Sequence, residues 1–230
     1  MISVNPSGTR SSPDGASAMA RAATAARREV PVGEQRPLEH RRAGGGEVYD
    51  DHPGRRKRDE EVDPDLAAHA DVKRAYPAIA HAADEVGTPQ IRNVGTVGGN
   101  LNQRPRCWYF RNEEFNCLKK GGSRCFAVNG ENQYHAIFGD GPCHIVHPSS
   151  LAVPAVALNA RFRVVGPAGE REIAAGDYYQ MPDRNLFGET ALAPNEILTH
   201  VLLPAPGTSK NATYEVRYKQ SHDWPLATWA

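Results

Sequence analysis

The chain has 230 residues, and its 27 basic and 27 acidic side chains give a formal net charge of zero at pH 7. This length supports one large or two small domains with a hydrophobic core. The balanced charge does not point to nucleic acid or an anionic membrane as a partner, and no stretch is apolar for long enough to span a bilayer.

Residues 1–62 differ in composition from the rest of the chain. Arg, Gly, Ser, Pro and acidic residues crowd this segment, and neither helical nor strand periodicity is visible. It lacks the apolar stretch of a secretory signal peptide, and it is too acidic for a mitochondrial transit peptide. Runs such as 54–61 cannot bury enough apolar surface to offset chain entropy. We therefore expect a disordered or non-native leader over residues 1–62.

The next segment, from Asp63, predicts helices. Asp65 can cap a helix whose apolar positions run from Leu66 to Tyr76. Pro77 can open a second helix that Gly87 would end. A turn at 88–89 then leads to the glycine-rich run 95–101.

The second half of the chain predicts strands that alternate with short helices. An apolar run at 151–158 is helix-like, a turn is expected at 167–170, and Asp177 can open another short helix. Strands are expected at 160–166, from 171, at 196–204 and from about 212. Helices followed by antiparallel strands predict the α+β fold class.

The glycine-rich run is the first candidate for binding chemistry. Gly98 and Gly99 permit backbone conformations closed to other residues, so main-chain N–H groups can converge on a phosphate. Thr96 and Asn100 add side chains that can bond a pyrophosphate or ribityl group. The run lacks the G-x-G-x-x-G spacing of a Rossmann fingerprint, and a purely structural Gly-Gly turn is the alternative.

The four cysteines all fall in one segment, with the spacing C-x9-C-x7-C-x17-C. Iron–sulfur clusters need four converging thiolates, and the glycines at 121–122, 139 and 141 can supply the bends of a ligating loop. Unrelated free cysteines remain an alternative, as does a zinc site completed by His135, His144 or His147. The candidate metal ligands are Cys107, Cys117, Cys125 and Cys143.

Together these motifs resemble the FAD-binding subunits of molybdopterin-dependent aldehyde oxidoreductases and xanthine dehydrogenases. The cysteine insertion is similar to that of the branch that carries an extra [4Fe-4S] cluster, which includes the flavoprotein subunit of 4-hydroxybenzoyl-CoA reductase. The resemblance extends from Leu66 to about residue 220. It rests on residues 89–101 (PQIRNVGTVGGNL), 106–111 (RCWYFR), 143–149 (CHIVHPS), 193–198 (APNEIL) and 219–221 (KQS).

The resemblance implies an electron-transfer subunit with FAD and a [4Fe-4S] cluster as cofactors. Electrons would pass from iron–sulfur centres through FAD to an external acceptor, and no catalytic acid–base residue is expected on this chain. The implied partners are a molybdopterin-binding large subunit and a [2Fe-2S] small subunit, with no nucleic acid and no membrane insertion. The implied location is the cytoplasm, or the periplasm if the chain is exported with a partner.

The same resemblance assigns the site residues. Leu198 would pack near the flavin or adenine, Lys219 would approach the isoalloxazine, and Ser150 stands where the family often has an aspartate that bonds the cofactor. The four cysteines would ligate the cluster. The remaining FAD-binding residues would be Ile91, Arg92, Asn93, Thr96, Gly98, Gly99, Asn100 and Ser149.

The sequence also departs from the family pattern at both ends. We expect a PCMH-like second FAD subdomain at 63–205 with a cysteine-rich insertion at 104–146. We do not find the family's Ala-Gly-Gly-Thr-Asp-Leu loop, so residues 1–62 are expected to be out of frame or foreign, with the N-terminal subdomain missing. Residues 206–230 would begin a truncated C-terminal domain. The alternatives are a flavin-free fragment without enzymatic activity and a structural Cys/His zinc module.

Overall fold

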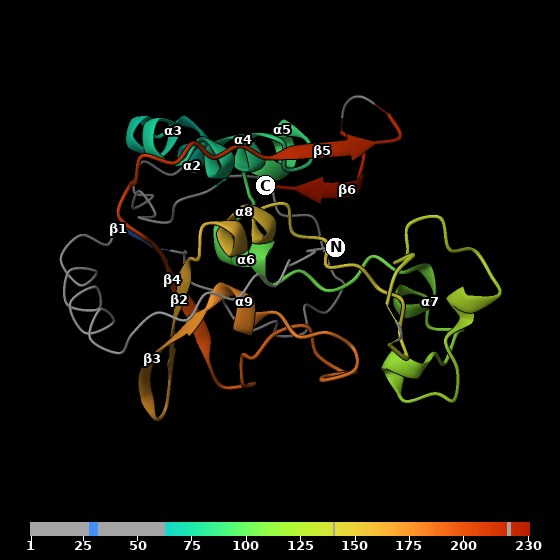
Figure 1. The fold of residues 1–230 in the computed structure, drawn as a ribbon. Helices are drawn as coiled ribbons and strands as arrows, with labels where there is room; N and C mark the ends of the chain where they lie inside the picture. Colours follow the sequence, from blue (N-terminus) through green and yellow to red (C-terminus); the bar gives the residue numbers. More distant parts are fainter. Residues whose placement is uncertain (1–27, 32–62, 140, 220–221) are drawn as a thin grey trace, which may run out of the picture.

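The computed structural model describes residues 28–31, 63–139, 141–219 and 222–230. Short helices and a four-stranded antiparallel sheet pack together, a two-stranded hairpin lies along the helices, and a lobe without strands extends to one side (Figure 1). The predicted α+β fold class is therefore confirmed. In the described part of the chain, no helix is both long and apolar enough to cross a membrane.

The first helical layer consists of α2 (Asp63–Ala68), α3 (Ala70–Ala75) and α4 (Pro77–Asp84). The single helix predicted from Asp65 to Tyr76 is wrong. The observed helical segment starts at Asp63 and is divided into α2 and α3 at His69. The backbone of His69 is extended, with φ −61° and ψ 119°. Pro77 opens α4 as predicted, because its fixed φ suits a first turn. Gly87, with φ +50°, follows the end of α4 in the left-handed conformation expected of it.

The main sheet has the strand order β1-β4-β2-β3, and every pairing is antiparallel. It consists of β1 (Arg28–Pro31), β2 (Arg161–Gly166), β3 (Gly169–Ala174) and β4 (Ile197–Leu203). The β2–β3 hairpin and β4 match the sequence prediction closely. Strand β1 lies in the segment where we expected no strand, and it pairs with β4 through registers such as Val30↔Val201. The rest of the expected leader lies outside the described residues.

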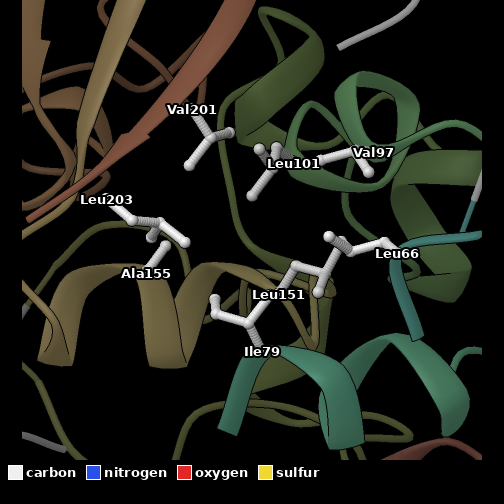
Figure 2. A pocket seen from close by; sticks show the side chains of 8 residues that line it. All are labelled: Leu66, Ile79, Val97, Leu101, Leu151, Ala155, Val201 and Leu203. Carbon is white, nitrogen blue, oxygen red and sulfur yellow. The ribbon is translucent and has the colours of Figure 1, made fainter. Parts of the chain in front are cut away.

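The hydrophobic core lies between the helices and the sheet. Phe162 and Val164 alternate on the inner face of β2 and are fully buried, and the core is completed by α6 (Val97–Leu101), α8 (Ala152–Ala157) and α9 (Ala175–Tyr178). This core contains a small apolar cavity of about 20 Å³, and Figure 2 shows the side chains that line it. With no polar lining it is a gap in the packing and not a ligand site. Its lining residues are Leu66, Ile79, Val97, Leu101, Leu151, Ala155, Val201 and Leu203.

The lobe at the side of the molecule is formed by residues 104–146, which we call the cysteine loop (Figure 1). It leaves the core after α6 and returns before α8. Its regular structure is limited to α7 (Trp108–Arg111) and the 3₁₀ turns η1 (Leu118–Lys120) and η2 (Phe126–Val128). The predicted insertion therefore coincides with a part of the chain that stands apart from the sheet.

The hairpin of β5 (Tyr214–Arg217) and β6 (Pro225–Trp229) lies along the helical layer (Figure 1). Arg217 joins it to α4: its guanidinium donates to the carbonyl oxygen of Glu85 at 3.0 Å and pairs with the Glu85 carboxylate at 2.8 Å. The connection between the two strands therefore comes close to the turn that precedes α5 (Pro89–Arg92).

Candidate functional site

The glycine-rich run forms the first turn of α6 instead of a free turn. Thr96 is the N-cap, with φ −112° and ψ 152°, and its Oγ1 accepts a hydrogen bond from the Gly99 backbone N–H at 3.0 Å. Gly99 is exposed, and a Cβ added there would meet nothing within 4 Å except Thr96 Oγ1. The backbone at Gly99 is therefore open to a ligand that approaches from outside.

Asn100 and Ser149 link this helix to the start of α8. Both side chains are buried, and the Ser149 hydroxyl donates to Asn100 Oδ1 at 2.6 Å while it accepts from the Ala152 N–H at 3.0 Å. Ser150 is buried beside them. The Asn100 oxygen, predicted as a cofactor contact, is thus directed into the protein, where it holds two predicted site segments together.

The segment predicted to lie beside the phosphate site is α5. Thr88 caps it, Ile91 is 52% exposed, and Asn93 is exposed at its end. The Arg92 guanidinium bonds the carbonyl oxygens of Val86 at 3.3 Å and Gly87 at 3.1 Å, so it fixes the turn before α5. Ile91 and Asn93 are therefore exposed to solvent, whereas the Arg92 side chain stabilises the turn before α5.

The connection between β5 and β6, which carries Lys219, reaches the turn before α5. His222 Nδ1 lies 3.2 Å from the Gly87 carbonyl oxygen, and the backbone N–H of Lys219 donates to Asp223 at 3.1 Å. Lys219 itself is exposed. The structure thus brings the predicted residue at 219 and the predicted segment 91–93 to one region, although more than 120 residues separate them in sequence.

Leu198 does not join this surface. It lies in β4 opposite Val164, has 0% exposed surface and belongs to the hydrophobic core. A side chain with no exposed surface packs the sheet and does not line a ligand-binding face. Leu198 therefore packs the core, and its place near the flavin or adenine stays a prediction.

Residues that the sequence reasoning missed support the other end of α6. The Tyr178 hydroxyl donates to Asn102 Oδ1 at 2.5 Å, and Tyr179 donates to the carbonyl oxygen of Leu101 at 3.4 Å. Burial raises the pKa of Tyr178 to about 12, so its hydroxyl stays protonated as the donor. The adjacent tyrosines are visible in the sequence, but no sequence pattern indicates that they contact the end of α6.

His147 packs between the backbone at Ser149 and the ring of Tyr179. Its ring lies 4.6 Å from that of Tyr179, and its Nδ1 accepts from the Ser149 N–H at 3.3 Å. Burial lowers the pKa of His147 to about 4, because the charged imidazolium would lose its hydration. The imidazole is therefore neutral at physiological pH.

The four cysteines gather within the cysteine loop as free thiols. Cys117 is buried and the others are half-buried. Burial raises the pKa of Cys107, and the thiols of Cys117 and Cys125 add to this effect; burial likewise raises that of Cys143, which is also influenced by Cys125 and Cys107. Each thiol thus influences, or is influenced by, the charge of at least one other.

The turn between two of these cysteines depends on glycine. Gly121 has φ +93°, and a Cβ added to Gly122 would lie 1.9 Å from the carbonyl oxygen of Asn116. The N–H of Gly122 closes the turn on the Cys117 carbonyl oxygen at 2.9 Å. The bend predicted here is therefore confirmed.

A zinc site would bring at least three ligands around one ion. Among residues 28–31, 63–139, 141–219 and 222–230, no three His, Cys, Asp or Glu side chains are grouped to hold a metal ion. A four-iron cluster is larger than a single ion, so its ligands stand farther apart.

Aromatic rings connect the cysteine loop to the hairpin. Trp108, which follows Cys107, lies 6.2 Å from Trp224 and 5.9 Å from Tyr134 between ring centroids. The Arg106 guanidinium stacks 4.8 Å from the Trp224 ring. The cysteine loop and the connection between β5 and β6 are thus in contact through Trp108 and Trp224.

Comparison with known proteins gives the family. Residues 64–206 match the family described as the FAD binding domain in molybdopterin dehydrogenase. The chain belongs to this family. The predicted family is thereby confirmed, and the match begins close to the boundary predicted at residue 63.

Curated relatives agree with this assignment. The chain is 37% identical over 169 residues to the aldehyde oxidoreductase FAD-binding subunit PaoB of Escherichia coli (strain K12), which covers 72% of this chain and 53% of that protein. It is 28% identical over 156 residues to the carbon monoxide dehydrogenase medium chain of Afipia carboxidovorans, covering 67% and 38%. These relatives are by name parts of oxidoreductases, and the chain spans about half of their length or less.

Solved structures of similar proteins include carbon monoxide dehydrogenase from Hydrogenophaga pseudoflava lacking the Mo-pyranopterin moiety, with a TM-score of 0.48 and 21% identity. Quinoline 2-oxidoreductase from Pseudomonas putida 86 gives a TM-score of 0.46 at 16% identity. In both comparisons 73% of this chain and 42% of the other are covered.

Proposed function

We propose that this chain is the FAD- and [4Fe-4S]-binding electron-transfer subunit of a molybdenum hydroxylase. Electrons would pass from iron–sulfur centres through FAD to an external acceptor. The observation that carries the proposal is the FAD-binding family match over residues 64–206, a range that includes a loop with four free thiols. When bound, the flavin supplies a junction between one-electron and two-electron carriers.

The residues at the start of α6 fit a phosphate of FAD. Gly99 leaves the backbone open on its outer side, where any larger side chain would occupy the approach. Thr96 Oγ1 accepts from the Gly99 N–H, and a hydroxyl can still donate its proton to a phosphate oxygen. The exposed surface of Ile91 and Asn93 and the ammonium of Lys219 would complete the binding surface, with the buried Gly98 behind it.

The donor set of the cysteine loop fits an iron–sulfur cluster. The loop carries four free thiols, and thiolate is the ligand that such clusters use. The raised pKa values of Cys107 and Cys143 mean that these two thiols are protonated without the metal, so cluster binding would release protons. In this proposal Cys107, Cys117, Cys125 and Cys143 are the ligands.

The proposed partners are a molybdopterin-binding large subunit and a [2Fe-2S] small subunit. The support is that the relatives are named as the FAD-binding subunit of an aldehyde oxidoreductase and as medium chains of carbon monoxide dehydrogenases. The substrate would then be oxidised on the large subunit, and this chain would need no catalytic acid or base. The complex would be cytoplasmic, or periplasmic if exported with a partner.

Cofactor content of the anaerobically purified chain tests the proposal. We expect flavin absorption bands, bound FAD, and about four iron and four sulfide per chain. Cys117→Ser should lose iron and keep FAD, whereas Gly99→Val should lose FAD and keep iron. An iron–sulfur shoulder without flavin would favour a flavin-free fragment, and a colourless zinc-containing sample would contradict both cofactor assignments.

A further inference from the structure

The cysteine loop carries a groove that includes none of the residues proposed to bind FAD or iron. It has a volume of about 340 Å³ and lies beside α7, in the lobe that extends to one side of the molecule (Figure 1). This volume is typical of small-ligand pockets. Three aromatic rings, two amides and one carboxylate line the groove: Trp108, Tyr109, Asn112, Phe115, Glu131 and Gln133. Apolar walls are thus combined with a small set of polar groups.

Contacts within the loop hold the two sides of this groove together. The Tyr109 hydroxyl accepts a hydrogen bond from the Glu131 backbone N–H at 2.6 Å. A Cβ added to Gly130 would lie 2.1 Å from the Tyr109 hydroxyl oxygen, so a larger residue there would force the two sides apart. Tyr109 and Phe115 meet edge to face, with ring centroids 5.0 Å apart. The loop itself therefore defines the shape of the groove.

The rings of the groove are free to receive a cation. Among the residues that the structure describes, no Lys or Arg side chain is stacked on Trp108, Tyr109 or Phe115. Trp108 is 42% exposed, so a cation can approach its ring from outside. Neighbouring rings already have such a partner: Arg104 lies 4.9 Å from Phe110, Arg106 4.8 Å from Trp224 and Arg124 4.5 Å from Phe126.

The charged groups around the groove are mainly negative. Glu131 is exposed, and within the described part of the chain its carboxylate forms no ion pair. Glu113 and Glu114, which follow Asn112, are exposed as well. Lys120 contacts the groove from outside, where it donates to the Asn112 carbonyl oxygen at 2.6 Å. Three carboxylates against this one lysine favour a cationic ligand.

The polar groups of the groove favour a guanidinium over other cations. A quaternary ammonium has no N–H group, so it would leave the side-chain oxygens of Asn112, Glu131 and Gln133 unused. A guanidinium stacks on an aromatic face and donates N–H groups in one plane, two of them to a single carboxylate. Free arginine would also bring a carboxylate, and no described cationic side chain lines the groove to pair with it. An arginine within a polypeptide has no such carboxylate.

We propose that this groove binds an arginine side chain of a partner protein. The guanidinium stacks on the exposed face of Trp108 and donates to the Glu131 carboxylate, and the apolar stem of the arginine packs against Phe115. The inference goes beyond the proposed function, and it requires neither bound FAD nor the iron–sulfur cluster.

Titration with a blocked arginine tests this assignment. Acetylarginine amide is added to the purified full chain with isotope-labelled tryptophan, and the nuclear magnetic resonance signal of the Trp108 indole N–H is followed. We expect a saturable shift with a dissociation constant on the order of 1 mM, because a single side chain makes few contacts. Acetylcitrulline amide has nearly the same shape without the charge. It should bind at least about tenfold more weakly, because hydrogen bonds between charged groups are stronger.

A matched pair of charge variants places the binding in the groove. Glu131→Gln keeps the size of the side chain and removes its charge, so acetylarginine amide should bind about tenfold more weakly. Glu113→Gln removes the same charge from an exposed residue that does not line the groove. It should weaken binding by less than about twofold, because solvent screens its charge.

The outcomes decide between a specific site and general attraction. Weaker binding of the citrulline compound, together with a larger effect of Glu131→Gln than of Glu113→Gln, supports the inference. Equal binding of the two compounds, equal effects of the two variants, or no Trp108 shift up to about 50 mM overturns it. Tighter binding of free arginine or choline than of acetylarginine amide overturns the assignment to a partner protein. FAD and iron contents of the same sample test the proposed function separately.

Discussion

The helix-and-sheet core and the cysteine loop are ordered by different interactions. The hydrophobic core draws on α2, α4, α6, α8 and the sheet, and none of its buried members lies between Leu101 and Leu151. The loop relies on aromatic contacts and on the Lys119–Glu189 pair. The core is therefore held by apolar packing, and the loop by ring contacts and a buried ion pair.

The largest expected effect lies in the core. Phe162 is fully buried in β2, and its ring lies 4.8 Å from that of Tyr178. Phe162→Ala should lower the free energy of unfolding by about 3–5 kcal/mol, because it removes a large side chain and leaves a cavity. Urea unfolding followed by circular dichroism measures this change. A loss below about 1 kcal/mol would contradict a core that depends on tight packing at this site.

Acid should weaken the junction between core and loop. The folded pKa of His147 is about 4, below its unfolded value of about 6.5, so between these values the unfolded chain binds the proton and the folded chain does not. Stability should therefore fall as the pH drops from about 6.5 to 4, by at most roughly 3 kcal/mol. Unfolding free energies at pH 7.0, 5.5 and 4.5 test this prediction.

His147→Asn is the control for that pH dependence. Asparagine keeps a hydrogen-bond acceptor for the Ser149 N–H but does not titrate. The contributions of all other groups are shared by the two proteins and cancel in the comparison. Equal pH slopes for wild type and His147→Asn would mean that His147 is not the responsible group.

A smaller effect is expected at the candidate phosphate site. Thr96→Ala removes the side-chain oxygen that caps α6 and should cost about 1 kcal/mol of stability in the flavin-free chain. Thr96→Ser keeps a hydroxyl and should stay close to wild type. If Thr96→Ala is as stable as Thr96→Ser, the cap has no structural role.

Local sequence signals predicted the parts of the fold that local interactions determine. The β2–β3 hairpin followed from alternation and a Pro-Ala-Gly turn, and α4 followed from Pro77 and Gly87. The glycine-rich run was expected to be a turn, since glycine is a poor helix former. It begins a helix because Thr96 supplies the cap and the core buries Val97 and Leu101.

Features that depend on contacts distant in sequence were not predictable in this way. Strand β1 exists through its pairing with β4, which lies about 170 residues away in the chain. No local sequence pattern predicts the ion pair between Lys119 and Glu189, because a lone lysine and a lone glutamate usually indicate a solvated surface. The burial of Leu198 likewise follows from the position of β4 beside β2 and from no property of residues 193–198.

The smallest global effect should come from the cysteine loop itself. Phe126 contacts Tyr109 and Phe115, with ring centroids 5.8 and 5.2 Å apart. Phe126→Ala, the same substitution as in the core, should change the free energy of global unfolding by less than about 1 kcal/mol. It should instead raise the rate of tryptic cleavage after Arg124, because only the loop opens. A global loss comparable to that of Phe162→Ala would mean that the loop and the core unfold as one unit, and the distinction between them would fail.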